Sequence, residues 1–290
     1  MQSNNPVFAR AEGFNGQAAQ SYGNQGYPAG GQGYQGYAQG YGQAPYPKTD
    51  PSSWQYPAGP VVEERMTIDS VVNRTAVMLL IVVASAAATW LLLPDGTEPG
   101  EANYLGMAWM VGAFGGLGLS FAISFMRKVS PVLVIAYAVL EGMFLGAVSE
   151  TFEWLYDGVV PGAVMGTTAA FVATLAAYKF FNIQVNDKFR KIVTIAMFGF
   201  FAIVMLDFLM GMFGNAMGFN DFGTLGLITS FVGLAIGIAM LMLDFDFVER
   251  GVAAGLPEQE SWRAAFGLVV TLIWIYIMML RILAILQSDN

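Results

Sequence analysis

The sequence has 290 residues, of which 56% are hydrophobic and 12% are charged, whereas soluble domains average about a quarter charged residues. It contains no cysteine, which excludes disulfides, thiol catalysis and thiolate metal sites, and no histidine, which excludes imidazole as a base, proton shuttle or ligand. The net charge of −8 argues against a nucleic-acid partner, which would require a basic surface. These counts disfavour an ordinary globular enzyme and indicate an integral membrane protein.

Residues 1–62 are rich in Gly, Gln and Tyr and contain no long apolar run, as in the stretch GYPAGGQGYQGYAQGYGQAPYP. Such a segment cannot bury enough apolar surface to offset the entropy of ordering its backbone. The sequence therefore predicts a disordered cytoplasmic tail. Its role is left open between a weak, multivalent Tyr/Gln contact segment and an inert tether.

Residues 63–290 are predicted to form the membrane domain, because long apolar runs alternate there with short polar loops. A bilayer core about 30 Å thick needs roughly 20 helical residues to cross it. The runs lack the alternation of apolar and polar residues that barrel strands show. We therefore expect an all-α bundle of seven transmembrane helices, at residues 76–93, 104–125, 132–148, 163–178, 192–213, 224–243 and 264–286.

The loops alternate in charge. Lys and Arg lie before the first helix and in the second–third, fourth–fifth and sixth–seventh loops, at Arg65, Arg74, Arg127, Lys128, Lys188, Arg190, Lys191, Arg250 and Arg263. In the intervening loops, all charged residues are acidic. Because basic loops remain in the cytoplasm, we expect a cytoplasmic N-terminus and an external C-terminus.

Four pairs of glycines lie four residues apart within or beside the predicted helices, at Gly112 and Gly116, Gly142 and Gly146, Gly162 and Gly166, and Gly233 and Gly237. Small residues at this spacing let helix backbones approach closely in lipid. The pairs predict a tightly packed bundle and say little about its chemistry.

Ionisable residues inside the predicted helices are the candidates for function, because charge in the hydrocarbon is costly. Glu141 lies in the middle of the third helix and has no neighbour in the sequence that would neutralise it. Asp207 and Arg281 fall at similar predicted depths in the fifth and seventh helices. The two residues are interpreted either as a structural ion pair or as functional groups. In a third interpretation, the long side chain of Arg281 reaches the membrane surface.

Asp244 and Asp246 end the predicted sixth helix. Two helical residues that are two apart point about 200° away from each other, so only one of these aspartates is expected to face the bundle. Asp246 and Arg250 are four residues apart, which is the spacing of a surface ion pair on a helix. The alternative interpretation is that both residues lie in a solvated loop.

The residues exclude several classes of protein. A retinal protein needs a lysine in its seventh helix, an intramembrane aspartyl protease typically has a GxGD sequence, and a serine protease needs a base. None of these is present, and no soluble domain exists for a nucleotide-binding motif. A channel, a transporter or a regulatory membrane protein remains, without enzymatic activity and without a cofactor.

Five strings in the sequence occur in a characteristic order: NPVF near the N-terminus, MTIDSVV before the first helix, AYAVLEGMFLG in the third, LDFDFVERGVAAGLPE after the sixth, and WRAAFGLVVTLIWIYIMMLRILAILQ at the end. With seven helices, they resemble the Bax inhibitor-1/YccA family, the transmembrane Bax-inhibitor-motif proteins, and its actinobacterial branch in particular. The resemblance implies six helices around a central seventh, and passive, pH-sensitive leakage of Ca²⁺ across a bacterial inner membrane.

The resemblance also implies a pH sensor made of two aspartates, one at the end of the sixth helix and one in the seventh, with an arginine of the second helix as a latch. By position, the first aspartate is Asp244 or Asp246, and the arginine is Arg127. The second aspartate falls at Met278 when the aromatic-x-acid pattern is matched, and at Thr271 when the chain is aligned without a gap. Neither residue is acidic.

The leading hypothesis is a passive cation leak channel, with Ca²⁺ as the expected ion and only transient coordination by hard oxygen ligands. Asp244 or Asp246 would form the gate with Arg127, and Glu141 would be a polar station within the membrane that supplies the missing acid. Without the second aspartate, the leak is expected to respond weakly to pH near neutrality. The alternative is a regulatory membrane protein that binds and modulates a membrane-bound AAA protease or another membrane complex.

Overall fold

The computed structural model of the chain describes residues 64–93, 102–181 and 185–288. The predicted tail, residues 1–62, lies outside this part of the chain, as do the acidic residues of the first loop.

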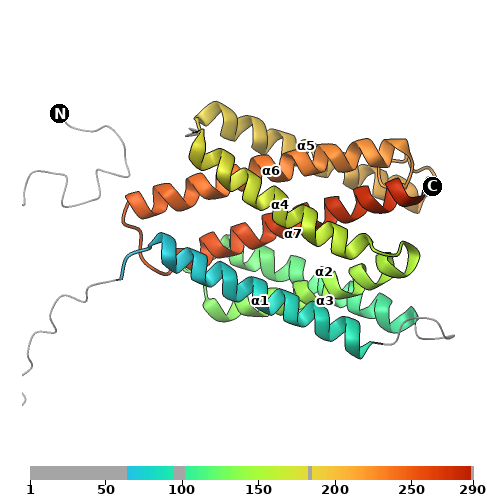
Figure 1. Cartoon of the computed structure of the whole chain (residues 1–290), viewed down its shortest axis with the longest axis horizontal. Coiled ribbons are helices and arrows are strands. Elements are labelled where there is room, and N and C mark those ends of the chain that lie inside the picture. The colour runs from blue at the N-terminus through green and yellow to red at the C-terminus, as the bar shows by residue number, and fades with distance from the viewer. Residues whose placement is uncertain (1–63, 94–101, 182–184, 289–290) are drawn as a thin grey trace, which may run out of the picture. The chain divides into compact units, whose positions relative to one another are not determined.

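The described residues form seven helices, α1 to α7, and each is long and apolar enough to cross a membrane (Figure 1). Their bounds are α1 Ile68–Leu92, α2 Ala102–Phe125, α3 Pro131–Leu155, α4 Val159–Phe180, α5 Asp187–Met212, α6 Thr224–Ala253 and α7 Glu260–Ser288. The predicted all-α, seven-helix membrane fold is confirmed.

Several helices run beyond the apolar windows from which they were predicted. α1 begins eight residues earlier than expected, because Thr67 and Ser70 form a capping box ahead of the polar first turns. α6 continues for ten residues past its predicted end, to Ala253. Asp244 and Asp246 therefore lie within a helix and not at its end, and the alternative of a solvated loop at this point is wrong.

α7 is the central helix of the domain. Of an apolar 18-residue stretch of α7, 61% is buried, compared with 17% of the corresponding stretches of α1, α4 and α5. It packs against α1, α3, α4 and α6, whereas α2 packs mainly on α3 and α5 mainly on α6 (Figure 1). The expected central seventh helix is confirmed, although α2 and α5 lie at the periphery.

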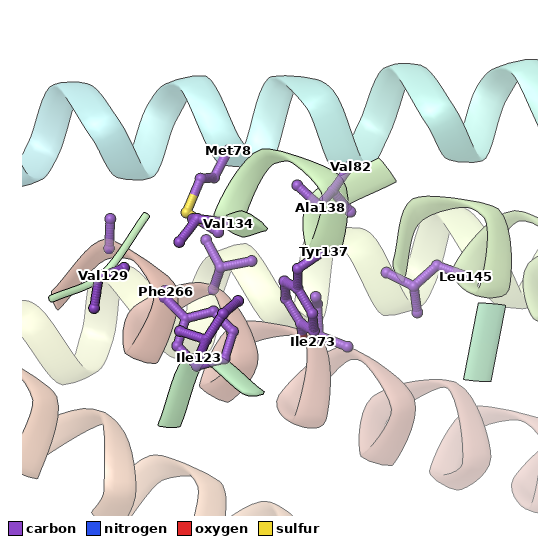
Figure 2. Close-up of a cluster of buried hydrophobic side chains, with 12 residues drawn as sticks. Met78, Val82, Ile123, Val129, Val134, Tyr137, Ala138, Leu145, Phe266 and Ile273 are labelled. Carbon is purple, nitrogen blue, oxygen red and sulfur yellow. The ribbon is translucent and has the colours of Figure 1, made fainter. Parts of the chain in front are cut away.

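The largest apolar cluster joins α1, α3 and α7 (Figure 2). Met78 of α1 and Val134 of α3 are fully buried there, and the ring of Tyr137 meets the edge of Phe266 at 4.9 Å between centroids. An aromatic pair of this geometry adds to the area that both rings bury. The cluster fixes the first half of α7 against the α1–α3 pair.

Glycines bring the helix backbones together, as their spacing predicts. A Cβ at Gly142 would lie 2.5 Å from the Val82 carbonyl oxygen, and one at Gly146 would lie 2.5 Å from that of Ala86. Because neither contact leaves room for a methyl group, α1 and α3 pack backbone to backbone.

Candidate functional site at the α6–α7 seam

Asp244 on α6 faces the central helix. The hydroxyl group of Thr271 on α7 donates a 2.6 Å hydrogen bond to its Oδ2 atom. A Cβ at Gly267, one turn earlier on α7, would lie 3.5 Å from the other carboxylate oxygen. Thr271 itself is 3% exposed. The structure thus identifies Asp244, and not Asp246, as the sixth-helix aspartate that points into the bundle.

Asp246 points to a different side of α6 and joins it to α5. Its carboxylate lies 2.9 Å from Nη2 of Arg190 and 2.9 Å from Nε of Arg250. Arg250 also donates to the carbonyl oxygen of Val185, at 2.7 Å. The helical ion pair between Asp246 and Arg250 that the spacing predicts is therefore present, and a second arginine completes it.

Besides Arg250, the arginine that holds the Asp246 carboxylate is Arg190 and not the expected Arg127. The backbone carbonyl of Arg127 accepts a hydrogen bond from Arg263, at 3.0 Å. Among the ion pairs of the described residues, none involves the Arg127 guanidinium. Sequence spacing could not find Arg190, because 56 residues separate it from Asp246.

Thr271, and not Met278, is the residue of α7 that faces Asp244. Thr271 meets Asp244, whereas Met278 lies two turns further along α7 in an apolar cluster with Phe200 and Ile236. Of the two positions at which the resemblance would place a second aspartate, Thr271 is the one that lies opposite Asp244, and its side chain ends in a neutral hydroxyl group.

Glu141 occupies a separate polar position. Its side chain lies one turn after Tyr137 on α3. A Cβ at Gly116 of α2 would lie 2.6 Å from its Oε2 atom, so the side chain points at α2. The structure brings Asp244 and Thr271 together, and it places Glu141 at the α2–α3 contact.

Asp207 and Arg281 do not form the direct ion pair expected from their depth, because no described ion pair joins them. Asp207 accepts backbone N–H groups from the loop between α5 and α6, and Arg281 donates to carbonyl groups of the same loop. Backbone N–H groups of the loop thus satisfy the Asp207 carboxylate, and backbone carbonyl groups of the loop satisfy the Arg281 guanidinium. The sequence placed the two charges at similar depths in the membrane, but it could not reveal the loop that contacts both.

The start of α1 and the α2–α3, α4–α5 and α6–α7 turns lie at one end of the bundle (Figure 1). Every described Lys and Arg except Arg281 lies in or near these segments, so we call this end the basic end and the opposite end the acidic end. At the basic end Arg65 pairs with Pro257 in an isolated β-bridge, and Arg74 forms an ion pair with Glu258. Glu64 also reaches Glu258: the hydrogen bond and the repulsion between their two carboxyl groups raise the pKa of Glu64. This contact fastens the chain before α1 to the α6–α7 turn.

The donor set does not resemble a tight metal site. Within the described residues, no group of three or more acidic side chains converges to hold a metal ion. Asp244 and Thr271 offer one carboxylate and one hydroxyl oxygen, whereas a resident Ca²⁺ ion takes six to eight oxygen ligands. The arrangement can contact a passing cation but does not enclose one.

Fold and site together define a multi-pass membrane protein in which an intramembrane carboxylate faces a buried central helix. A family model described as Bax inhibitor 1 like matches residues 5–288, and the chain belongs to this family. The chain is also similar to an uncharacterized protein of Chlamydia muridarum (strain MoPn / Nigg), with 27% identity over 169 residues, which cover 57% of this chain and 68% of that protein.

Proposed function

We propose that this protein is a passive leak for cations, with Ca²⁺ as the expected ion, in a bacterial inner membrane. One observation carries the proposal: the carboxylate of Asp244 faces Thr271 on the most buried helix, within a membrane-spanning segment. An ionisable group at such a place is costly and typically marks an ion or proton pathway. Family membership supports the same class of membrane protein.

The surroundings of Asp244 favour conduction of a cation over its tight binding. A carboxylate attracts a cation that has lost part of its water shell, and conduction requires that the ion can also leave. A single carboxylate and a hydroxyl group meet both conditions. We place the basic end in the cytoplasm, because basic loops remain on that side, and we assign Asp246 with Arg190 and Arg250 as the closure of that end.

Reconstitution of the full chain in liposomes tests the proposal. When Ca²⁺ is added outside vesicles that contain a Ca²⁺ indicator, Ca²⁺ should enter and the indicator signal should rise. The rate of Ca²⁺ entry should fall about tenfold in Asp244→Asn, which is equivalent to a loss of about 1.4 kcal/mol in the stabilisation of the ion. Asp69→Asn is the matched control, because Asp69 is an exposed carboxylate in the first turn of α1.

Two results would contradict the proposal in different ways. Equal flux through Asp244→Asn and Asp69→Asn would mean that ions do not pass Asp244. No flux of Ca²⁺, Na⁺ or K⁺ through any form would favour the alternative, a regulatory protein that binds a membrane-bound protease or another membrane complex.

A further inference from the structure

The loop between α5 and α6, residues 213–223, is held to α5 by a buried carboxylate. Asp207 is 1% exposed, and it accepts backbone N–H groups from Met217 at 2.6 Å, Gly218 at 3.1 Å and Asn220 at 2.8 Å. Hydrogen bonds to an ionised acceptor are stronger than those between neutral groups. A carboxylate used in this way fixes the path of the loop backbone.

Two other helices hold the same loop. Nη2 of Arg281 on α7 donates to the carbonyl oxygens of Phe219 at 3.2 Å and Asp221 at 3.5 Å. The ring of Phe222 packs on two aromatic rings at the end of α3, at 6.0 Å from Phe152 and 6.1 Å from Tyr156. The α5–α6 loop therefore bridges α5, α7 and α3 at the acidic end of the bundle.

Behind this loop, the α6–α7 seam continues inward to Asp244. In order along α7, the residues Arg281, Met278, Trp274 and Thr271 meet Gly226, Gly233, Gly237 and Asp244 of α6. Met278 also packs with Phe200 and Ile236 in an apolar cluster. Between the loop and the polar contact at Asp244, the seam is therefore apolar and closely packed.

The geometry points to the α5–α6 loop as the gate at the acidic end of the ion path, with Asp207 and Arg281 as the positioning residues that hold it closed. The inference rests on the proposed leak. A cation that approaches Asp244 from this end meets the loop first and the apolar cluster next, and an apolar constriction excludes water and ions. Polar contacts hold most of the loop, so it can move away while α6 and α7 stay packed.

Thiol labelling tests whether the loop controls access, independently of ion flow. The chain has no cysteine, so Ser230→Cys introduces a single thiol. Ser230 is fully buried on α6 and bonds to the carbonyl oxygen of Gly226 one turn nearer the loop. In lipid nanodiscs, where a charged maleimide reaches both faces, this thiol should react slowly. Adding Arg281→Gln should accelerate labelling about tenfold, because it removes a charge-assisted contact.

Two controls separate opening of the loop from loosening of the bundle. Arg281→Lys keeps a positively charged donor and should label as slowly as the parent. Thr174→Cys places the thiol at a buried position of α4, away from the loop, and should not respond to Arg281→Gln. Faster labelling at both thiols, or at neither, would overturn the inference.

A reversible crosslink connects the loop to ion flow. The side-chain amide of Asn220 donates to the carbonyl oxygen of Val204 on α5, at 3.0 Å, so a short bis-methanethiosulfonate reagent should join Asn220→Cys to Val204→Cys through two mixed disulfides. Crosslinking should lower the Ca²⁺ flux several-fold, and a reductant should restore it. Flux that ignores the crosslink, or a pair that does not crosslink in the intact protein, would contradict the gate. Loop-dependent labelling without flux in any form would leave the closure standing and remove the proposed leak.

Discussion

The hydroxyl group of Thr271 donates a 2.6 Å hydrogen bond to the carboxylate of Asp244 and so joins the central helix to α6. Two facing carboxyl groups would titrate as a coupled pair, whereas a threonine hydroxyl stays neutral at every pH the protein meets. The contact at this point of the seam therefore contains a single titratable group. A leak that passes Asp244 should therefore follow a single titration step with pH, without the second step that a coupled pair would add.

Restoring a second acid should add a second titration step. In Thr271→Asp, two carboxyl groups would face each other across the seam and share a proton, so the flux should change in two coupled steps as the pH rises. In Met278→Asp, the new acid would lie in the apolar cluster with Phe200 and Ile236. That variant should lose stability without a comparable pH response. Liposome flux measured against pH distinguishes the two positions.

A second titration step in the flux of the unmodified protein would contradict this argument. It would indicate a second acid that Thr271 does not provide, and Glu141 would then be the candidate. Glu141→Gln should abolish such a response.

Removal of Asp207 and Arg281 should give less than additive losses of stability. Asp207→Asn alone should cost about 1.5–3 kcal/mol, because the loop N–H groups lose a charged acceptor. Arg281→Gln alone frees the same loop from its other side. Once the loop has been released, the second change removes little more. Thermal unfolding of the two single variants and the double variant measures the coupling, and strictly additive losses would show that the loop does not connect them.

Arg190 and not Arg127 should stabilise the basic end of α6. Arg190→Gln removes a 2.9 Å ion pair with Asp246. Because the Arg190 side chain is 47% exposed, solvent screening limits the expected loss to about 0.5–1 kcal/mol. Arg127→Gln should stay within about 0.5 kcal/mol of the parent, as is usual for surface positions. Thermal unfolding of the two variants decides this, and a larger loss from Arg127→Gln would reinstate Arg127 as the latch.

The contact between Glu64 and Glu258 should weaken as the pH rises. The pKa of Glu64 is raised above its ordinary value of 4.5 by its hydrogen bond to, and repulsion from, Glu258. A raised carboxyl pKa means that the stabilisation is complete below the unfolded pKa and is lost as the pH rises through the folded one. Glu64→Gln keeps a donor toward Glu258 at every pH and should remove this dependence.

Hydrogen exchange at Met66 measures the effect, because its N–H group bonds to the Leu256 carbonyl oxygen in the same contact. Between about pH 4 and 7 the N–H of the parent should lose protection relative to that of Glu64→Gln, and higher salt should reduce the difference. Equal protection at all pH values would mean that the two carboxyl groups do not interact.

Sequence patterns were sufficient for the features that depend on local composition. Apolar length located seven helices, and the spacing of Gly142 and Gly146 predicted the close α1–α3 packing. The angle between Asp244 and Asp246 predicted that they point to different sides of α6. The family resemblance offered Thr271 as one of two positions opposite the sixth-helix aspartate, and packing shows that it faces Asp244. The partners of the other charges were not predictable, because Arg190 reaches Asp246, and the α5–α6 loop reaches Asp207 and Arg281, only through tertiary packing across 10 to 62 residues.

Gly142 offers the sharpest test of the helix packing that supports the site. A Cβ there would lie 2.5 Å from the Val82 carbonyl oxygen and 2.6 Å from the Ser85 Cβ, so Gly142→Ala must push α1 away from α3. It would also stretch the 2.7 Å hydrogen bond from Ser85 to the carbonyl oxygen of Val139. Overpacking of this kind costs about 1–3 kcal/mol.

Gly118→Ala is the matched control for this change, because a Cβ at Gly118 of α2 meets nothing within 4 Å. There the new methyl group should leave stability unchanged or raise it by up to about 1 kcal/mol, through the higher helix propensity of alanine. Thermal unfolding in one detergent compares both variants with the parent. Equal effects of the two substitutions would mean that α1 and α3 are not in backbone contact at Gly142, and the position of α7 against that pair would then lose its support.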